Sequence, residues 1–66
     1  MNKTNLQKMR ESREMTQWGL AQLSMVSLSS IQKYESRNRS INHAAGERVH
    51  ALAKILNCKI ADLLEV

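Results

Sequence analysis

Apolar side chains recur every three or four positions along this chain, and no segment alternates with the period of two that a half-buried strand requires. The pattern therefore predicts an all-α fold of five helices. The first begins near Thr4, and the others should cover residues 17–24, 28–35, 42–56 and 60–64.

Two of these helices are preceded by hydroxyl side chains that can cap them. Thr16 stands before 17–24 and Ser27 before 28–35, and such oxygens accept hydrogen bonds from the first turn of a helix. Ala21 is small enough to let the two helices cross closely. This is the outline of a helix-turn-helix, whose second helix enters the DNA major groove. The side chains spaced to fill the wedge between the helices are Leu20, Val26, Ile31 and Tyr34.

The fourth helix should carry one buried stripe and end at Asn57, because Asn tolerates the left-handed conformation that often follows a helix. The expected stripe consists of Ile41, Ala45, Val49, Leu52 and Leu56.

Composition narrows the classes of protein. A chain of 66 residues has room for one domain, 1–66, with one modest core, and an enzyme is not expected at this size. Its net charge of +4 suits a polyanionic partner. No apolar run approaches the ~20 residues of a membrane span. The single cysteine, Cys58, cannot form an internal disulfide, which fits the cytoplasm. His43 and His50 have no ligand-type neighbours, so no metal site is expected.

Five motifs in order, from about Leu6 to Leu64, resemble the Cro- and phage-repressor-type helix-turn-helix proteins, also called the XRE family. The resemblance implies a five-helix, lambda-repressor-like DNA-binding domain with its helix-turn-helix at the second and third helices. It implies no cofactor and no small-molecule ligand. The motifs are Leu6-x-x-Met9-Arg10-Glu11, Met15-Thr16-Gln17-x-x-Leu20-Ala21, Val26-Ser27-x-x-x-Ile31-x-x-Tyr34-Glu35, Leu52-Ala53-Lys54-x-Leu56 and Ile60-x-Asp62-Leu63-Leu64.

The chain departs from the family pattern at its glycines. The resembled family usually has Gly where Glu14, Met25 and Arg37 stand here, and a non-Gly residue in a left-handed turn costs roughly 1–2 kcal/mol. Conversely, Gly19 and Gly46 fall inside predicted helices, where each costs about 1 kcal/mol relative to Ala. We therefore expect a marginally stable domain, or one supported by a partner.

The outward face of the third helix holds the candidate base-reading residues. The resemblance implies base contacts by Leu28, Ser29 and Lys33, and helical spacing adds Gln32. Lys33 can donate to guanine O6 and N7, and Gln32 can pair with adenine. Leu28 can touch a thymine methyl group, while Ser29 bonds to almost any base. The alternative is an ordinary solvated helix face.

Phosphate contacts are expected at the starts of the second and third helices and in the basic loop that follows. A helix N-terminus and cationic side chains both attract phosphate oxygens. The alternatives are that Ser27 only caps its own helix and that the basic loop is merely solvated. The candidate phosphate ligands are Gln17, Gln22, Ser27, Ser30, Arg37, Asn38 and Arg39.

Two further residues have candidate structural roles. The resemblance implies that Arg10 and Glu35 form a partly buried ion pair that locks the first helix to the third, and losing one partner of such a pair costs on the order of 3–5 kcal/mol. For Trp18, partial packing against a neighbouring helix is favoured over a place beside DNA.

One recognition helix covers only one half-site, so we expect a homodimer on double-stranded DNA. The C-terminal apolar side chains exceed what one short helix can bury, although Ile60 and Leu63 could instead fill the core. The candidate dimer patch comprises Ile60, Leu63, Leu64 and Val66.

The prediction is therefore a transcriptional regulator that represses by occupying an operator. Two alternatives remain open at this point. The chain could be the antitoxin or accessory regulator of a mobile element with a protein partner. It could also be a helix-turn-helix scaffold used only for protein–protein contact, but the positive charge of the third helix favours DNA.

Overall fold

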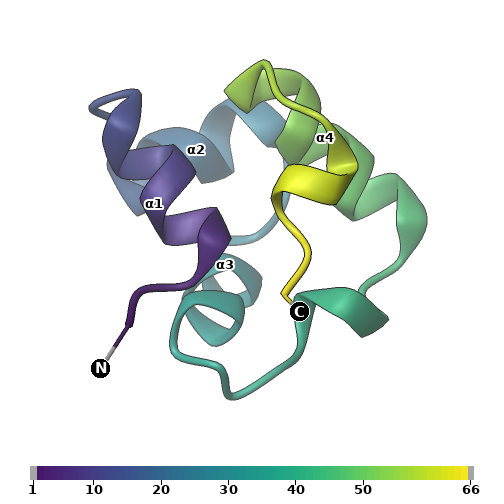
Figure 1. Ribbon diagram of the computed structural model, residues 1–66. Helices are drawn as coiled ribbons and strands as arrows, with labels where there is room; N and C mark the ends of the chain where they lie inside the picture. The colour runs from purple at the N-terminus through teal and green to yellow at the C-terminus, as the bar shows by residue number, and fades with distance from the viewer. Residues whose placement is uncertain (1, 66) are drawn as a thin grey trace.

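Four α-helices and two short 3₁₀ turns make up residues 2–65, the part of the chain that the computed structural model describes, and this part contains no strand (Figure 1). The all-α prediction is confirmed. The elements are α1 (Asn5–Ser12), α2 (Gln17–Ser24), α3 (Leu28–Glu35), η1 (Ile41–His43), α4 (Gly46–Leu56) and η2 (Ile60–Asp62).

The first three helices begin at hydroxyl caps, and those at Thr16 and Ser27 are the two that the sequence predicts. Thr4 Oγ1 accepts a hydrogen bond from the backbone N–H of Gln7, with an N···O distance of 3.2 Å. Thr16 Oγ1 accepts from Gly19 N at 2.9 Å, and Ser27 accepts from the first turn of α3 in the same way. Each cap satisfies one of the N–H groups that a helix leaves unpaired at its start.

The turns that join the helices use left-handed backbone at non-glycine residues. φ is 55° at Glu14, 61° at Met25 and 65° at Arg37, the three positions where the resembled family usually has Gly, and 54° at Asn57. Both the helix end at Asn57 and a left-handed conformation at Met25 are therefore present. The backbone N–H of Met25 closes α2 by donating to Ala21 O at 2.9 Å.

Met25→Gly should stabilise the domain by about 1 kcal/mol, because Gly adopts positive φ without a steric penalty. The Met25 side chain is 92% exposed, so its removal sacrifices little packing. For a domain of this size we expect the midpoint of thermal unfolding to rise by roughly 4–8 °C per kcal/mol, measured by circular dichroism. Met25→Ala keeps the Cβ atom and serves as the matched control. A glycine variant no more stable than the alanine variant would show that the turn is unstrained.

The two glycines differ from expectation. A Cβ atom added at Gly19 would lie 3.1 Å from Thr16 Oγ1, the oxygen that caps α2, so an alanine there would crowd the cap. Replacing Gly19 by Ala is therefore not expected to give the simple gain in helix stability that the sequence suggested. Gly46 is the first residue of α4 rather than an interior one, and a Cβ atom there would meet nothing within 4 Å.

The core is built from every helix of the bundle. α2 packs against both α3 and α4, α1 contacts α3, and α4 contacts η2. The expected wedge of Leu20, Val26, Ile31 and Tyr34 is buried, which fixes the angle between α2 and α3. The largest fully buried side chains are Leu6, Leu20, Ile31, Leu52, Leu56 and Leu63.

The prediction of one continuous helix from Asn42 was wrong. The Asn42 side chain instead bonds the backbone of Glu65: its Nδ2 donates to Glu65 O at 2.6 Å and its Oδ1 accepts from Glu65 N at 2.8 Å. The helical path is interrupted after η1, where the backbones of Ala44 and Ala45 are extended, with ψ of 154° and 136°. The segment therefore turns through η1, and α4 starts only at Gly46, after an exposed Ala45 that belongs to no buried stripe.

The predicted fifth helix is also shorter than expected. Only a 3₁₀ turn forms over Ile60–Asp62, closed at its start by Asp62 Oδ2, which accepts from Lys59 N at 2.9 Å. Because 3₁₀ turns seldom extend beyond three or four residues, the chain leaves this geometry before Leu64.

Candidate nucleic-acid interface

The four candidate base-reading residues all reach the surface of α3. Ser29 and Gln32 are exposed, and Leu28 and Lys33 are half-buried. The opposite face of the same helix is anchored in the core by Ile31 and Tyr34. α3 therefore presents one polar, cationic face outward. Contacts of these residues with bases remain a prediction.

The two serines at the start of α3 bond to each other. Ser27 Oγ accepts from Ser30 N at 3.1 Å and donates to Ser30 Oγ at 2.8 Å. Ser27 is exposed, so its cap still leaves it at the surface, whereas Ser30 is only 9% exposed. The structure therefore argues against Ser30 as a phosphate ligand, because its hydroxyl turns back to the cap.

The two glutamines of α2 differ in whether their side chains are bonded within the domain. Gln17 Nε2 donates to Glu35 Oε1 at 3.0 Å, so this side chain belongs to a polar network inside the domain. Its backbone N–H still lies in the first turn of α2, where a phosphate oxygen would be favoured. The side chain of Gln22 is exposed.

The basic loop after α3 contains one tethered and one available arginine. Arg37 Nη1 forms an ion pair with Glu65 Oε1 at 3.0 Å, and its Nη2 donates to the backbone oxygen of Asn2 at 2.8 Å. Arg39 and Asn38 are exposed. Among residues 2–65, the Arg39 side chain has no ion-pair partner, although its backbone N–H donates to Lys33 O at 3.2 Å. Arg37 is thus held by the protein although it is exposed, and its role as a phosphate ligand remains a prediction.

Sequence reasoning did not single out Glu65, and hydrophobic periodicity contains no signal for it. Its Oε2 accepts from the backbone N–H of Asn5, the first residue of α1, at 2.7 Å. This hydrogen bond, followed by the one from Arg37, holds the pKa of the Glu65 carboxyl below its usual value. The carboxylate also lies at a helix N-terminus, where negative charge is favoured.

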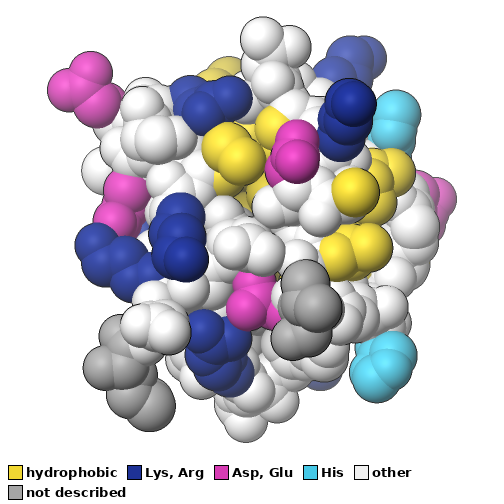
Figure 2. Space-filling model, in the orientation of Figure 1, with side chains coloured by type: hydrophobic (Ala, Val, Ile, Leu, Met, Phe, Trp, Pro, Cys, Tyr) yellow, Lys and Arg dark blue, Asp and Glu magenta, His cyan; other side chains and the backbone are white. Residues whose placement is uncertain are grey.

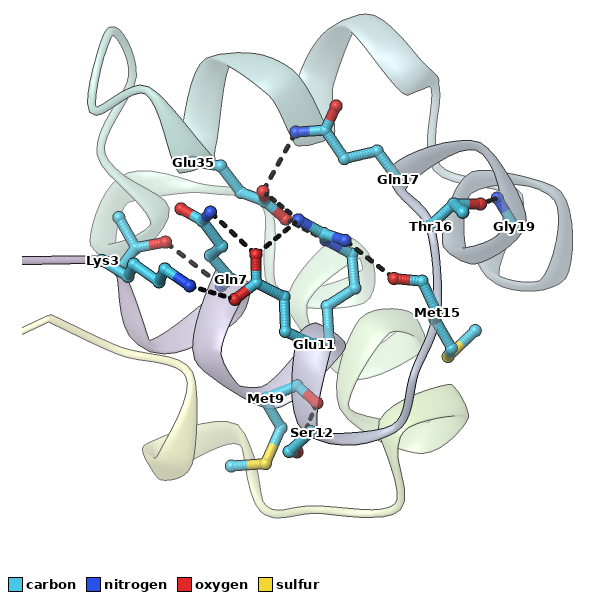
Figure 3. A network of polar contacts seen from close by, with 12 residues as sticks. Lys3, Gln7, Met9, Glu11, Ser12, Met15, Thr16, Gln17, Gly19 and Glu35 are labelled. Carbon is cyan, nitrogen blue, oxygen red and sulfur yellow. Dashed lines mark hydrogen bonds and ion pairs between the residues drawn. The ribbon is translucent and has the colours of Figure 1, made fainter.

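Arg10 and Glu35 form the ion pair implied by the resemblance (Figure 3). Arg10 Nε donates to Glu35 Oε2 at 2.7 Å and Nη2 to Oε1 at 2.9 Å, a bidentate arrangement. Arg10 Nη1 also donates to the backbone oxygen of Met15 at 2.7 Å. The hydrogen bond to Glu35 is the main cause of a raised Arg10 pKa, which burial partly opposes. One arginine therefore joins α1, the turn after it and the end of α3.

An open hollow lined by both apolar and polar side chains lies beside the turn of the helix-turn-helix. Trp18 is 63% exposed, so its ring is at most partly packed against the rest of the domain. Trp18 and Met25 line the hollow together with the beginning of α3 at Leu28. The single tryptophan therefore lies next to the candidate reading face.

Residues 2–65 include no group of three His, Cys, Asp or Glu side chains that could hold a metal ion. Within the same part of the chain, no helix is long and apolar enough to cross a membrane. Cys58 is half-buried, and burial raises the pKa of its thiol.

The candidate dimer patch is smaller than predicted. Leu63 has no exposed surface and fills the core, so its assignment to the patch was wrong. Ile60 is 40% exposed and Leu64 is half-buried, while Val66 lies outside the described residues. Figure 2 shows apolar side chains grouped on the face formed by α4 and the C-terminal segment.

Comparison with known families accounts for nearly the whole chain. The model of the Cro/C1-type helix-turn-helix DNA-binding domain matches residues 5–66. The comparisons with curated proteins and with solved structures find no match. With α2 and α3 crossing through a buried wedge, as a helix-turn-helix requires, the chain belongs to the family of Cro/C1-type helix-turn-helix DNA-binding domains.

Proposed function

We propose that this protein is a sequence-specific transcriptional regulator that binds an operator in double-stranded DNA as a homodimer and represses by occupying it. The proposal depends mainly on one observation: α3 has an exposed polar face and is anchored firmly to the core. Its outward face offers Ser29, Gln32 and Lys33 to solvent, while the Arg10–Glu35 pair fixes the helix to the core. A rigid polar helix of this kind suits insertion into the major groove.

The side chains of α3 divide the reading of bases among them. The ammonium group of Lys33 donates to guanine O6 and N7, and the amide of Gln32 pairs with adenine N6 and N7. Leu28 contacts a thymine methyl group, and Ser29 adds a hydrogen bond of low selectivity. Lys33 therefore contributes most of the discrimination between bases.

Phosphate contacts around this helix set its register on the duplex. One DNA strand has its phosphates bound by the backbone N–H of Gln17 and by the side chains of Gln22 and Ser27. Asn38 and Arg39 follow α3 and are exposed. They contact the DNA phosphates on the other side of the groove. The net charge of +4 favours the association of the whole domain with DNA.

Dimerisation follows from the number of bases that one α3 can reach. Two copies related by a two-fold axis place their recognition helices ~34 Å apart on one face of the duplex. Ile60 and Leu64 supply the apolar centre of a self-complementary contact. Because this patch is small, the dimer is weak in solution and tightens on DNA.

Selection of duplexes from a randomised pool tests the proposal. The expected product is a palindrome whose half-sites are centred about 10 base pairs apart, bound cooperatively. Sedimentation at increasing protein concentration should show a weak monomer–dimer equilibrium. Ile60→Asp and Leu64→Asp should abolish that equilibrium and the cooperativity.

Leu23→Asp provides the matched control, because Leu23 is 62% exposed on α2, outside the patch. It should leave the oligomeric state unchanged. Non-cooperative binding by a strict monomer would exclude the homodimer, and failure to enrich any sequence would exclude sequence-specific binding. A monomer that still protects a palindrome cooperatively would move the dimer contact elsewhere.

A further inference from the structure

Glu65 connects three parts of the chain that are far apart in sequence. Its carboxylate accepts from Asn5 N at the start of α1 and from Arg37 in the loop after α3. Its backbone exchanges two hydrogen bonds with the side chain of Asn42 in η1. The neighbouring Leu64 O accepts from Asn5 Nδ2 at 2.7 Å. Residues 64 and 65 thus fasten the loop after α3 to the first helix.

The side chain of Arg37 is bonded at both terminal nitrogens. One binds Glu65 and the other donates to Asn2 O, while the backbone N–H of Arg37 donates to Tyr34 O at 3.2 Å. These contacts hold the guanidinium against the N- and C-terminal segments. Arg39, two residues later, is exposed and forms no ion pair within residues 2–65.

An isolated surface ion pair would contribute little to stability, typically about 0–1 kcal/mol. Here the same carboxylate also binds the first N–H of α1, where the helix dipole favours negative charge. The lowered pKa of Glu65 agrees with this double use of the carboxylate. The contact therefore joins the loop after α3 to α1 more firmly than an isolated surface ion pair would.

Resting on the function proposed above, we propose that Glu65 is a positioning residue for DNA binding. It holds Arg37 on the protein, and this fixes the loop formed by residues 36–40 so that Asn38 and Arg39 meet the phosphate backbone already ordered. We call the contact of Arg37 with Glu65 the clasp. In this proposal the side chain of Arg37 fixes the loop and is not a phosphate ligand. A loop ordered in advance binds more tightly because less conformational entropy is lost on binding.

Salt titrations of DNA binding test this division of roles. Each phosphate contact contributes about 0.9 to the slope of log affinity against log salt concentration, so Arg39→Ala should reduce the slope by about one unit. Glu65→Gln keeps the shape of the side chain but loses its charge. We expect it to weaken operator binding 3- to 10-fold, on the order of the 0.5–1.5 kcal/mol that ordering a mobile side chain costs. We also expect it to lower the slope and to shrink the effect of Arg39→Ala in the double variant.

Glu14→Gln is the matched control, because it removes one negative charge at an exposed residue outside the clasp. Its slope should equal that of the unchanged protein. If Glu65→Gln instead tightens binding and steepens the slope, Glu65 competes with phosphate for Arg37 and the proposal is overturned. A lower melting temperature with unchanged affinity and slope would reduce Glu65 to a purely structural role and would also overturn it.

A DNA-independent measurement separates this proposal from the proposed function. The Asn5 amide is bonded to Glu65, so its hydrogen exchange should accelerate in Glu65→Gln and in Arg37→Gln, but not in Glu14→Gln. If the unchanged protein binds no duplex while these exchange rates change as expected, the proposed function fails and the clasp stands. Unchanged exchange in both variants would refute the clasp. Should Glu65→Gln not fold, Arg37→Gln replaces it in the salt titrations, where a full unit of lost slope with unchanged Asn5 exchange would make Arg37 a phosphate ligand.

Discussion

Arg10→Met should destabilise the domain by about 3–5 kcal/mol, the cost of leaving a buried charge without its partner. The side chain of Glu35 is only 4% exposed and would retain just the amide of Gln17 as a donor. The backbone oxygen of Met15 would also lose its hydrogen bond. Because a small domain has a total stability near the low end of 5–15 kcal/mol, we expect the variant to be largely unfolded at 25 °C. Urea unfolding followed by circular dichroism measures the change.

Arg13→Met is the matched control on the same side of the molecule. Arg13 Nε donates to Leu56 O at 2.7 Å, but Arg13 is exposed and has no buried carboxylate partner. We expect a cost on the order of 1 kcal/mol, as for an ordinary hydrogen bond. The double variant Arg10→Met/Glu35→Leu should recover much of the loss, because it removes both buried charges. Equal costs for Arg10→Met and Arg13→Met would show that the pair does not lock the helices together.

Local features of the fold were predictable because they depend on neighbouring residues. A hydroxyl before an apolar helical repeat was enough to locate the caps at Thr16 and Ser27, and both form. Asn57 was recognisable as a helix end for the same reason. In each case the relevant hydrogen bonds span only a few residues, so a one-dimensional pattern contains them.

Features set by distant contacts were not predictable in this way. The side chain of Asn42 bonds the backbone of Glu65, 23 positions later, and no local pattern contains that contact. The same residue holds Arg37, whose positive charge had suggested a phosphate ligand. Apolar spacing assigns a side chain to a helix face, but it cannot say whether that face meets the core or solvent. Leu63 therefore proved to be buried and Trp18 exposed.

The site was predicted unevenly for a related reason. The exposed face of α3 could be predicted because the opposite face carries Ile31 and Tyr34, two large apolar side chains at helical spacing that favour burial. Ser30, one position before Ile31 and four before Tyr34, lies on the buried side of the helix with them. The pairing of Arg10 with Glu35 required the family resemblance, because nothing in their spacing brings residues 25 positions apart together.

Lys33→Ala and Arg39→Ala should weaken DNA binding in different ways. Lys33→Ala should cost ~1–3 kcal/mol on the selected operator and relax the preference at one base position, because it removes a base-reading ammonium group. Arg39→Ala should weaken binding to every duplex about equally and reduce the salt slope by about one unit, because it removes a phosphate contact. Binding isotherms on the operator, on its single-base variants and on an unrelated duplex, each at several salt concentrations, separate the two effects. Lys54→Ala is the control, because Lys54 is an exposed lysine near the end of α4, away from α3. If Lys33→Ala weakens all duplexes equally, as Arg39→Ala does, then α3 is not the element that reads the sequence.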